Sequence, residues 1–408
     1  MERARRTGQL ADAWAQIGVG DGVALCAVEL WLIELPFLRP VLTAKGEHRS
    51  RPLVLVKLIA ESDHGTVEGW GECAALADTT YDHEDAAHSF DVLNQSMVPA
   101  LVDQAGRAGR RLPRPAGLHD VALAAPDHPL ALAALEMATA DTHLRAEGRS
   151  LAGVIGVEGR SVVVGAVVGR SASADTAVTE VRGLVDQGFT RVKVKVGPGW
   201  DIEPLDAVTG AFPDLAVQAD ANGSYTESDM DHLGKLDRFG LLCLEQPFDR
   251  ADLAGHARLA ELIDTPICLD ESLDSVDAAL EALAMGACSV VCIKPSRLGG
   301  LGPALRLVGS CTASGTAMWM GGMFESGYAR GVNTTLAALP GFSWPGDLSP
   351  SGGYLGADLV PASVVDRAGH GGALTNPVPR GAGMGTPPDP GRFGRYVVRH
   401  HRIEVGRA

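Results

Sequence analysis

Five charged residues recur in the middle of the chain at nearly constant intervals. Lys195, Asp220, Glu245 and Asp270 follow one another 25 residues apart, and Lys294 comes 24 residues later. Each residue closes a short apolar run. A strand–helix unit has roughly that length, since eight such units make a barrel of about 250 residues. Because each interval equals one strand–helix unit, each charge lies at the same end of a successive parallel strand. The spacing therefore predicts five charges at one rim.

Strand-like apolar runs alternate with amphipathic helical patterns over residues 156–350. The alternation predicts an α/β fold of the (β/α)7β TIM-barrel type, in which active-site residues stand at the carboxyl ends of the strands. The candidate strands are VVVGAVV, RVKVKV, LAVQAD, LLCLEQ, PICLD, SVVCIK, AMWMGG and FSWPGD.

The flanking segments have different patterns. Residues 24–155 begin with CAVELWLIEL, RPLVLVKLIA and VEGWGE and continue with helical periodicity, which predicts an antiparallel sheet with helices, an α+β domain. Residues 1–23 are predicted to be an extension, either a loose leader or a first helix. Residues 351–408 are rich in Gly and Pro before a last strand-like run, GRYVVRHHRIEV, and are expected to pack back towards the α+β domain.

Composition restricts the class of protein. The chain has 408 residues, 46% of them hydrophobic, so it can bury a large core. Its formal net charge of -15, with no basic stripe, argues against nucleic acid or an anionic membrane as a partner. No apolar segment approaches the roughly 20 residues of a membrane span. Seven cysteines without a CxxC pair fit a reducing cytoplasm, and small metabolites are the expected partners.

Three carboxylates at one rim repel one another unless a cation binds them. Asp220, Glu245 and Asp270 offer the oxygen ligands that Mg²⁺ prefers. One acidic residue at a strand end can equally be a helix cap, but three at a single period favour a metal site. The sequence therefore predicts a Mg²⁺ site, which Mn²⁺ can also occupy.

The run TRVKVKVGPGW alternates valines with lysines, so Lys193 and Lys195 share one face of a strand. We expect the valines to face the helices and the lysines to face the barrel mouth. A neighbouring ammonium favours the neutral amine that a general base requires, which makes Lys195 the candidate base and Lys193 its tuning neighbour. Lys294 is expected across the ring, where the two lysines could act on opposite faces of one carbon acid.

Other catalytic signatures are weaker. HEDAAH, at 83–88, resembles a zinc-protease helix, but its histidines are five residues apart rather than four. No G-x-S-x-G elbow, P-loop or Rossmann fingerprint occurs in the sequence. A binding or structural protein without turnover remains the non-enzymatic alternative, and the complete set of lysines and carboxylates argues against it.

The motifs resemble the enolase superfamily, specifically its muconate-lactonising subgroup and the o-succinylbenzoate synthase/N-succinylamino acid racemase branch. They are KVKV, DANGSY, LEQPF, CLDES, IKPSRLGG and GGMFESG, with GWGEC at 69–73 and PGDLSPS at 345–351. The resemblance runs from about Cys26 into the Gly/Pro-rich C-terminal segment. It implies that the α+β domain caps the barrel and that its loops close over a substrate.

The resemblance also implies roles for individual residues. The catalysts would be Lys195 and Lys294, and the Mg²⁺ ligands would be Asp220, Glu245 and Asp270. In addition, we expect Lys193, Asn222 and Glu325 to be supporting residues. Glu325 ends the seventh strand and is expected to be a structural or supporting group rather than a ligand.

Several positions depart from the branch. PVLTAKG, at 40–46, places Leu42 and Lys45 where a substrate loop typically carries Arg and Phe. Cys292 replaces the usual Asn before IKP, and Ser296 replaces the usual Gly after it. These departures affect the choice of substrate more than the chemistry.

The implied activity is dehydration of a 2-succinyl-6-hydroxy-cyclohexadiene-carboxylate to o-succinylbenzoate, a step of menaquinone biosynthesis, through an enediolate. Racemisation of N-succinylamino or other N-acylamino acids can share that site. A muconate-type cycloisomerase, or a racemase specific for another N-acylamino acid, is the alternative. The substrate is expected to be a small carboxylate and the protein a homo-oligomer.

Overall fold

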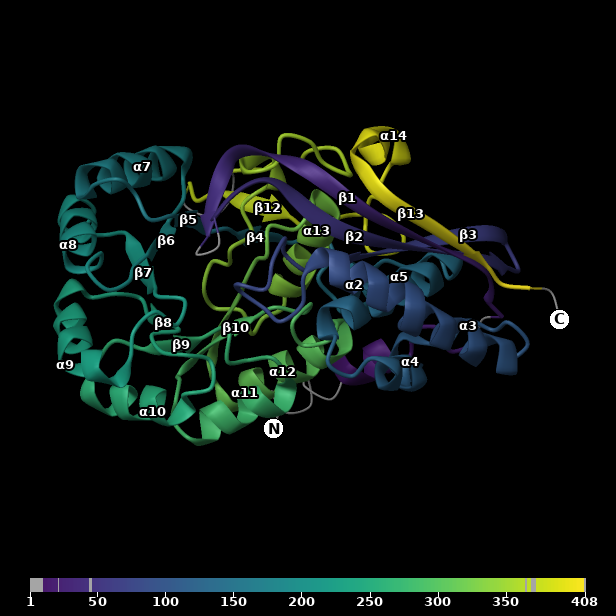
Figure 1. Cartoon of the computed structure of the whole chain (residues 1–408), viewed down its shortest axis with the longest axis horizontal. Coiled ribbons are helices and arrows are strands. Elements are labelled where there is room, and N and C mark those ends of the chain that lie inside the picture. Colours follow the sequence, from purple (N-terminus) through teal and green to yellow (C-terminus); the bar gives the residue numbers. More distant parts are fainter. Residues whose placement is uncertain (1–9, 21, 44–45, 364, 368–371, 407–408) are drawn as a thin grey trace.

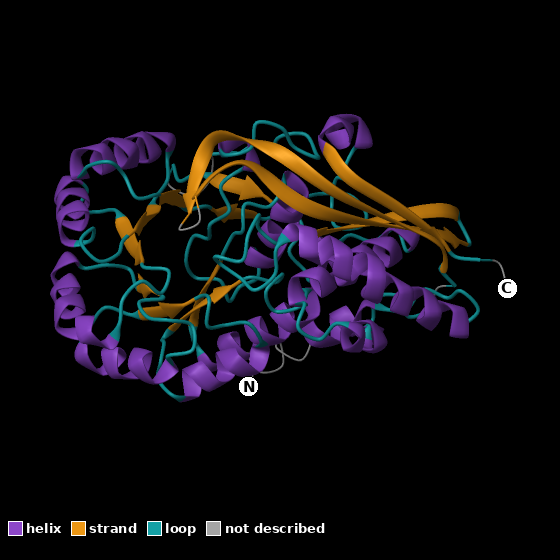
Figure 2. Cartoon of the chain, viewed as in Figure 1, coloured by secondary structure: helices purple, strands orange, loops and turns teal. Residues whose placement is uncertain are grey.

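The computed structural model describes residues 10–20, 22–43, 46–363, 365–367 and 372–406. Its two main sheets are a seven-stranded parallel sheet, with strands in the sequential order β5 to β11, and a four-stranded antiparallel sheet of order β13-β1-β2-β3 (Figures 1 and 2). The first sheet curls inside a row of helices, as the barrel prediction requires. The strands are β1 (Ala24–Thr43), β2 (Gly46–Ser62), β3 (Gly65–Cys73), β4 (Ser161–Val163), β5 (Ala166–Val168), β6 (Arg191–Lys195), β7 (Ala216–Asp220), β8 (Leu244–Glu245), β9 (Ile267–Leu269), β10 (Val290–Ile293), β11 (Ala317–Met320), β12 (Thr375–Pro377) and β13 (Val397–Glu404).

In the antiparallel sheet, the middle of β1 is buried on both faces. Along β1, Val28 and Leu30 belong to one core cluster, whereas Trp31 and Ile33 belong to a second cluster that continues into the barrel. This alternation follows from the two-residue period of a strand. The sheet therefore joins the cap helices on one side to the barrel on the other.

Two glycines of the GWGEC motif let a helix lie directly on the sheet. A Cβ atom at Gly69 or Gly71 of β3 would overlap backbone atoms of α5. The cap helices are α2 (Ala86–Val92), α3 (Val98–Arg107), α4 (His119–Ala124) and α5 (Pro129–Ala146), with a π-helical turn at Leu93–Met97 between the first two.

The barrel helices begin and end at ordinary capping signals. Ser173 and Ser275 accept hydrogen bonds from the amides of Thr176 and Ala278 at the starts of α7 and α11, and Gly188 ends α7 with a left-handed backbone. Besides the cap helices, the α-helices are α6 (Leu151–Val154), α7 (Ala174–Gln187), α8 (Ile202–Ala211), α9 (Met230–Leu233), α10 (Leu253–Leu262), α11 (Val276–Ala284), α12 (Leu301–Ser314), α13 (Gly327–Ala337) and α14 (Pro390–Phe393), the last of which lies beside the antiparallel sheet.

The eighth barrel position differs from the sequence prediction. The expected strand FSWPGD is irregular, and only Gly346 forms a parallel bridge, to Val164. The segment still spans the gap, because the amide of Gly165 donates to Gly346 at 2.7 Å and the amide of Asp347 donates to Met320 at 2.9 Å. Pro345 has no N–H for a ladder, which explains the missing strand.

Both end segments of the described chain pack against the rest of the fold. Residues 10–15 are helical, and Trp14 and Ile17 are buried in the main core. At the other end, β13 pairs antiparallel with β1 (Figure 1). Among the described helices, none combines the length and the apolar composition needed to cross a bilayer.

Candidate active site

The charges that are regularly spaced in sequence lie side by side at the carboxyl ends of consecutive strands. Lys195 pairs in register with Asp220, and Asp220 with Glu245. Asp270 directly follows β9, and Lys294 directly follows β10. The structure therefore brings all five predicted residues to one rim, as a row of three carboxylates with a lysine at each end.

The lysines contact the carboxylates beside them. Lys195 Nζ lies 2.6 Å from Asp220 Oδ2, and Lys294 Nζ lies 2.7 Å from Asp270 Oδ2. Asp220, Glu245 and Asp270 are each at most 1% exposed. Ionised carboxylates tolerate such burial only with strong compensation.

That compensation is uneven along the row. Burial disfavours the charged form of each group, but Lys195 and Lys193 lower the pKa of Asp220, while Lys294 and Arg297 hold that of Asp270 well below its usual range. Burial and the charge of Asp220 instead raise the pKa of Glu245 to about 8. Glu245, in the middle of the row, is thus the carboxylate whose negative charge is least compensated.

A bound divalent cation would offset this remaining negative charge. Oxygens of Glu245 and Asp270 lie within 4.8 Å of each other and of the Cys292 sulfur, while Asp220 lies beside them in contact with Lys195 and Lys193. Hard cations bind carboxylate oxygens in preference to sulfur. This buried group of carboxylates can therefore hold a metal ion.

Lys193 is buried beside the carboxylates, and its charge is already balanced. Its Nζ lies 2.8 Å from Asp347, 3.1 Å from Asp220 and 3.1 Å from Glu245. Burial alone would lower the pKa of Lys193, but these carboxylates raise it well above the usual value. Lys193 is a fixed cation below the row, and its tuning of Lys195 stays a prediction.

Asp347 is a site residue that sequence reasoning missed. It forms ion pairs with both Arg191 and Lys193. Arg191 also donates to Gln218, whose amide donates to Glu245 at 2.5 Å. Asp347 lies in the quoted PGDLSPS motif, but nothing in the pattern indicated that it reaches across to β6.

Tyr81 and Arg297 are two further residues that the sequence analysis did not single out. Tyr81 comes from the cap, between β3 and α2, and its hydroxyl hydrogen-bonds both Asp270 and Lys294. The Lys294 ammonium lies 4.6 Å from the centre of the Tyr81 ring. Arg297 Nη1 donates to Asp270 Oδ1 at 2.5 Å. Arg297 lies within IKPSRLGG, whereas Tyr81 had no local signal.

Asn222 lies where a supporting residue was predicted. Its side-chain oxygen accepts from Lys195 Nζ at 2.6 Å, and its amide donates to Glu271 at 2.8 Å. Its φ of 45° is in the left-handed region, which Asn tolerates better than most residues. The loop after β7 thus aims Asn222 at the end of the Lys195 side chain.

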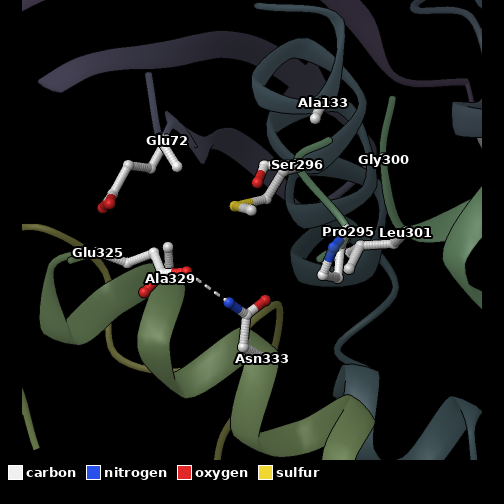
Figure 3. Close-up of a pocket in the computed structure, with 11 residues that line it drawn as sticks. Glu72, Ala133, Pro295, Ser296, Gly300, Leu301, Glu325, Ala329 and Asn333 are labelled. Carbon is white, nitrogen blue, oxygen red and sulfur yellow. Dashed lines mark hydrogen bonds between the residues drawn. The ribbon is translucent and has the colours of Figure 1, made fainter. Parts of the chain in front are cut away.

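Glu325 lies apart from the row, in a cavity between cap and barrel (Figure 3). The side chain of Asn333 donates to Glu325 at 3.0 Å, and Arg330 pairs with Glu325 at 2.8 Å. Ser296 also lines this cavity. The contacts of Glu325 agree with a structural role rather than a metal-binding one.

The cap holds the loop that carries Glu325. Arg51 of β2, 1% exposed, donates to the carbonyls of Met323 and Phe324, each at 3.1 Å. Glu72 of β3 accepts from the amide of Ser326 at 3.0 Å. Burial raises the pKa of Glu72 to about 7. Both ends of the loop are therefore tied to the cap.

The predicted substrate loop is only partly described. Leu42 lies near the end of β1, where it pairs in register with Glu47 of β2. Lys45 falls outside the described residues. Their roles towards a substrate stay predictions.

Comparisons with known proteins agree with this geometry. Residues 176–392 match the model of the enolase C-terminal domain-like family. The chain belongs to the enolase superfamily. An N-succinylamino acid racemase of Amycolatopsis sp is 40% identical over 90% of this chain and 95% of its own length. An o-succinylbenzoate synthase of Geobacillus kaustophilus is 35% identical over 90% of this chain and 94% of its own.

A solved structure extends the comparison to the whole fold. A member of the enolase superfamily from Listeria innocua superposes with a TM-score of 0.86 at 31% identity, covering 94% of this chain and 100% of that protein. The predicted family and the predicted barrel with its cap are thus confirmed.

Proposed function

We propose that this chain is a Mg²⁺-dependent o-succinylbenzoate synthase whose site also racemises N-succinylamino acids. The observation that carries the proposal is the row of three buried carboxylates with Lys195 at one end and Lys294 at the other. Relatives that bear each of the two names cover about nine tenths of the chain, which supports a site suited to both reactions.

Both reactions begin with removal of a proton next to a substrate carboxylate. Lys195 is the proposed base, because its amine reaches the mouth and is partly open to solvent. In the dehydration, Lys294 acts as a fixed cation beside the developing negative charge. In racemisation, Lys294 must also give a proton to the opposite face of the same carbon, or take one from it.

Asp220, Glu245 and Asp270 would hold the metal. Mg²⁺, when bound, supplies positive charge that stabilises the negative charge developing on the substrate carboxylate. Mn²⁺ has the same ligand preference and is expected to substitute. The remaining elements of the proposal are a small carboxylate substrate, a role in menaquinone biosynthesis, a cytoplasmic location and a homo-oligomeric state.

The test is a pair of assays on one preparation. Purified protein is assayed for o-succinylbenzoate formation and for racemisation of N-succinylamino acids, before and after exhaustive chelation. Both activities should disappear on chelation and return with Mg²⁺ or Mn²⁺, and Asp220→Asn should resemble the chelated protein.

Other outcomes would change the assignment. Turnover of a muconate but of neither proposed substrate would indicate the cycloisomerase, and racemisation of only a different N-acylamino acid would indicate a specialised racemase. Full activity after chelation would refute the metal site.

A further inference from the structure

The HEDAAH segment, which the proposed function does not use, brings a histidine of α2 to the start of α5. His83 and His88 lie five residues apart, so they do not form the pair of a zinc-protease helix. His88 instead faces His128, which directly precedes α5, and the Nε2 atoms of the two rings lie 3.0 Å apart. His83 lies nearby and contacts the carbonyl oxygen of Asp127 at 2.6 Å. Two imidazoles from different parts of the cap are therefore in direct contact.

The two rings meet through their nitrogens. Their centres are 5.1 Å apart, and their planes are tilted by 45°. Bonds from a cation such as Zn²⁺ to imidazole are about 2.0–2.1 Å long, so two nitrogens bound at angles between 90° and 109° lie about 2.8–3.4 Å apart. The distance of 3.0 Å between the Nε2 atoms falls within this range. One cation could therefore bind both nitrogens with little movement of either side chain.

The surroundings of the pair allow a cation to enter. His88 is exposed and His128 is half-buried, so solvent reaches the rings. Burial and the charges of His88 and His83 lower the pKa of His128, and the neutral ring is the form that binds a metal. The carboxylate of Asp127 acts on His128 in the opposite direction and would offset part of the charge of a bound cation.

We propose that His88 and His128 form a surface site for one borderline divalent cation of the Cu²⁺, Ni²⁺ and Zn²⁺ class. The site goes beyond the proposed function, because neither histidine contacts the row of carboxylates. Imidazole suits these cations, whereas Mg²⁺ prefers oxygen ligands. The two metal sites therefore fill independently.

Binding exchanges one hydrogen bond for two bonds to the metal. Without metal, one ring donates its Nε2–H to the other. On binding, the lone pairs of both Nε2 atoms bond to the cation, the displaced hydrogen moves to Nδ1 of the same ring, and water fills the remaining positions. Nδ1 of His128 is buried without a hydrogen-bond partner among the described residues, so its N–H is costly there. This cost favours Cu²⁺, which binds nitrogen ligands most strongly in this class.

A bound cation would link two elements on either side of the segment that carries Tyr81. This segment runs from β3 to α2, and its Glu84 already accepts from two amides in the first turn of α5. The helices α2 and α5 pack against each other in the cap (Figure 1). The cation adds a second link between them, from His88 to His128, and it stabilises the folded chain because the unfolded chain separates the two ligands.

The test measures binding rather than turnover. Full-length protein without an affinity tag is titrated with Ni²⁺ and with Zn²⁺ by calorimetry in excess Mg²⁺. We expect one ion per chain and a higher thermal midpoint when it is bound. One equivalent of Cu²⁺ should show splitting from two nitrogens in its electron paramagnetic resonance spectrum.

Variants assign the bound ion to the histidine pair. His88→Ala and His128→Ala should each weaken binding at least tenfold, since even the loss of an outer partner typically costs 10- to 100-fold in metal affinity. His88→Gln keeps a polar side chain of similar size and should lose binding as well. His64→Ala, which removes an exposed histidine in the turn between β2 and β3, is the matched control and should bind as wild type. Circular dichroism spectra identify any variant that fails to fold.

Two results would overturn the inference: no binding by the folded wild type in excess Mg²⁺, or unchanged affinity in folded His88→Ala. An inactive protein that binds Ni²⁺ through the histidine pair would refute the proposed function alone. An active protein that binds none would refute only the histidine site.

Discussion

The two lysines of the site have nearly the same bond to a carboxylate but very different surroundings. The Lys195 side chain is 31% exposed, and among the described residues its hydrogen-bond partners are the barrel residues Asp220 and Asn222. The Lys294 side chain is 6% exposed and contacts Tyr81 of the cap as well as Asp270. Lys195 can exchange protons with solvent, whereas Lys294 depends on neighbours that the cap supplies. The two ends of the site therefore offer one lysine that solvent reaches and one that the cap buries.

Replacing either lysine should have the largest effect on racemisation. Lys195→Ala and Lys294→Ala should each lower racemisation on the order of 10²- to 10⁴-fold, the usual contribution of a positioned acid or base. In deuterated solvent, each variant should stop α-proton exchange for one enantiomer of an N-succinylamino acid and keep it for the other. If either variant exchanges both enantiomers at wild-type rates, the lysines do not act on opposite faces.

Tyr81→Phe should have the next largest effect, on one side only. The change removes a hydroxyl that accepts from Lys294 and donates to Asp270. Loss of a hydrogen bond to a charged partner costs enough to slow exchange on the Lys294 face about tenfold. The Lys195 face is the internal control, and equal slowing of both faces would indicate a general change in the site.

Asn222→Ala tests the exposed side in the same way and should cost less. Its side-chain oxygen accepts from Lys195, but water can replace that acceptor at a partly exposed amine. We expect exchange on the Lys195 face to fall by less than about fivefold, since the lost hydrogen bond is largely replaced. If Asn222→Ala slowed α-proton exchange more than Tyr81→Phe does, the proposed difference between Lys195 and Lys294 would be contradicted.

Glu136→Gln should have the smallest effect on activity and a clear effect on stability. Glu136 of α5 accepts from the amides of Leu301 and Gly302 at the start of α12, the helix that follows Lys294. Burial raises the pKa of Glu136 to about 8 from 4.5. The folded protein therefore binds this proton more tightly than the unfolded chain, and the associated stability is lost as pH rises towards 8.

The variant lacks this titration, so its free energy of unfolding relative to wild type should increase between pH 5 and pH 8 in urea titrations. Glu84→Gln is the matched control. Glu84 accepts from the amides at the start of α5, and burial raises its pKa to about 7. The effect of Glu84→Gln on the free energy of unfolding should therefore be complete at a lower pH than that of Glu136→Gln. Parallel curves for wild type and Glu136→Gln would contradict the assignment.

The sequence predicted the row of charges because strand–helix units of constant length fix the register, as with Lys195 opposite Asp220. It could not predict Asp347, which reaches Lys193 from an irregular segment without periodicity. The error at FSWPGD has the same origin, because apolar residues suggested a strand that Pro345 interrupts.

Contacts between the cap and the barrel could not be predicted either. Tyr81 and Asp270 are 189 residues apart, and only the packing of the two parts brings them together. The same holds for Arg51 and the carbonyl of Met323. Local sequence patterns predict whether a segment is a helix or a strand. Contacts such as these depend on how the cap and the barrel pack together after those elements have formed.

The pairing of β13 with β1 has a consequence during protein synthesis. β1 leaves the ribosome long before residues 397–404, the strand that covers its outer edge. Until then, β1 presents unpaired backbone groups along an apolar strand, which favours association with other chains. The edge of β1 thus stays unprotected until β13 has been made, and slow translation prolongs the interval in which nascent chains can aggregate.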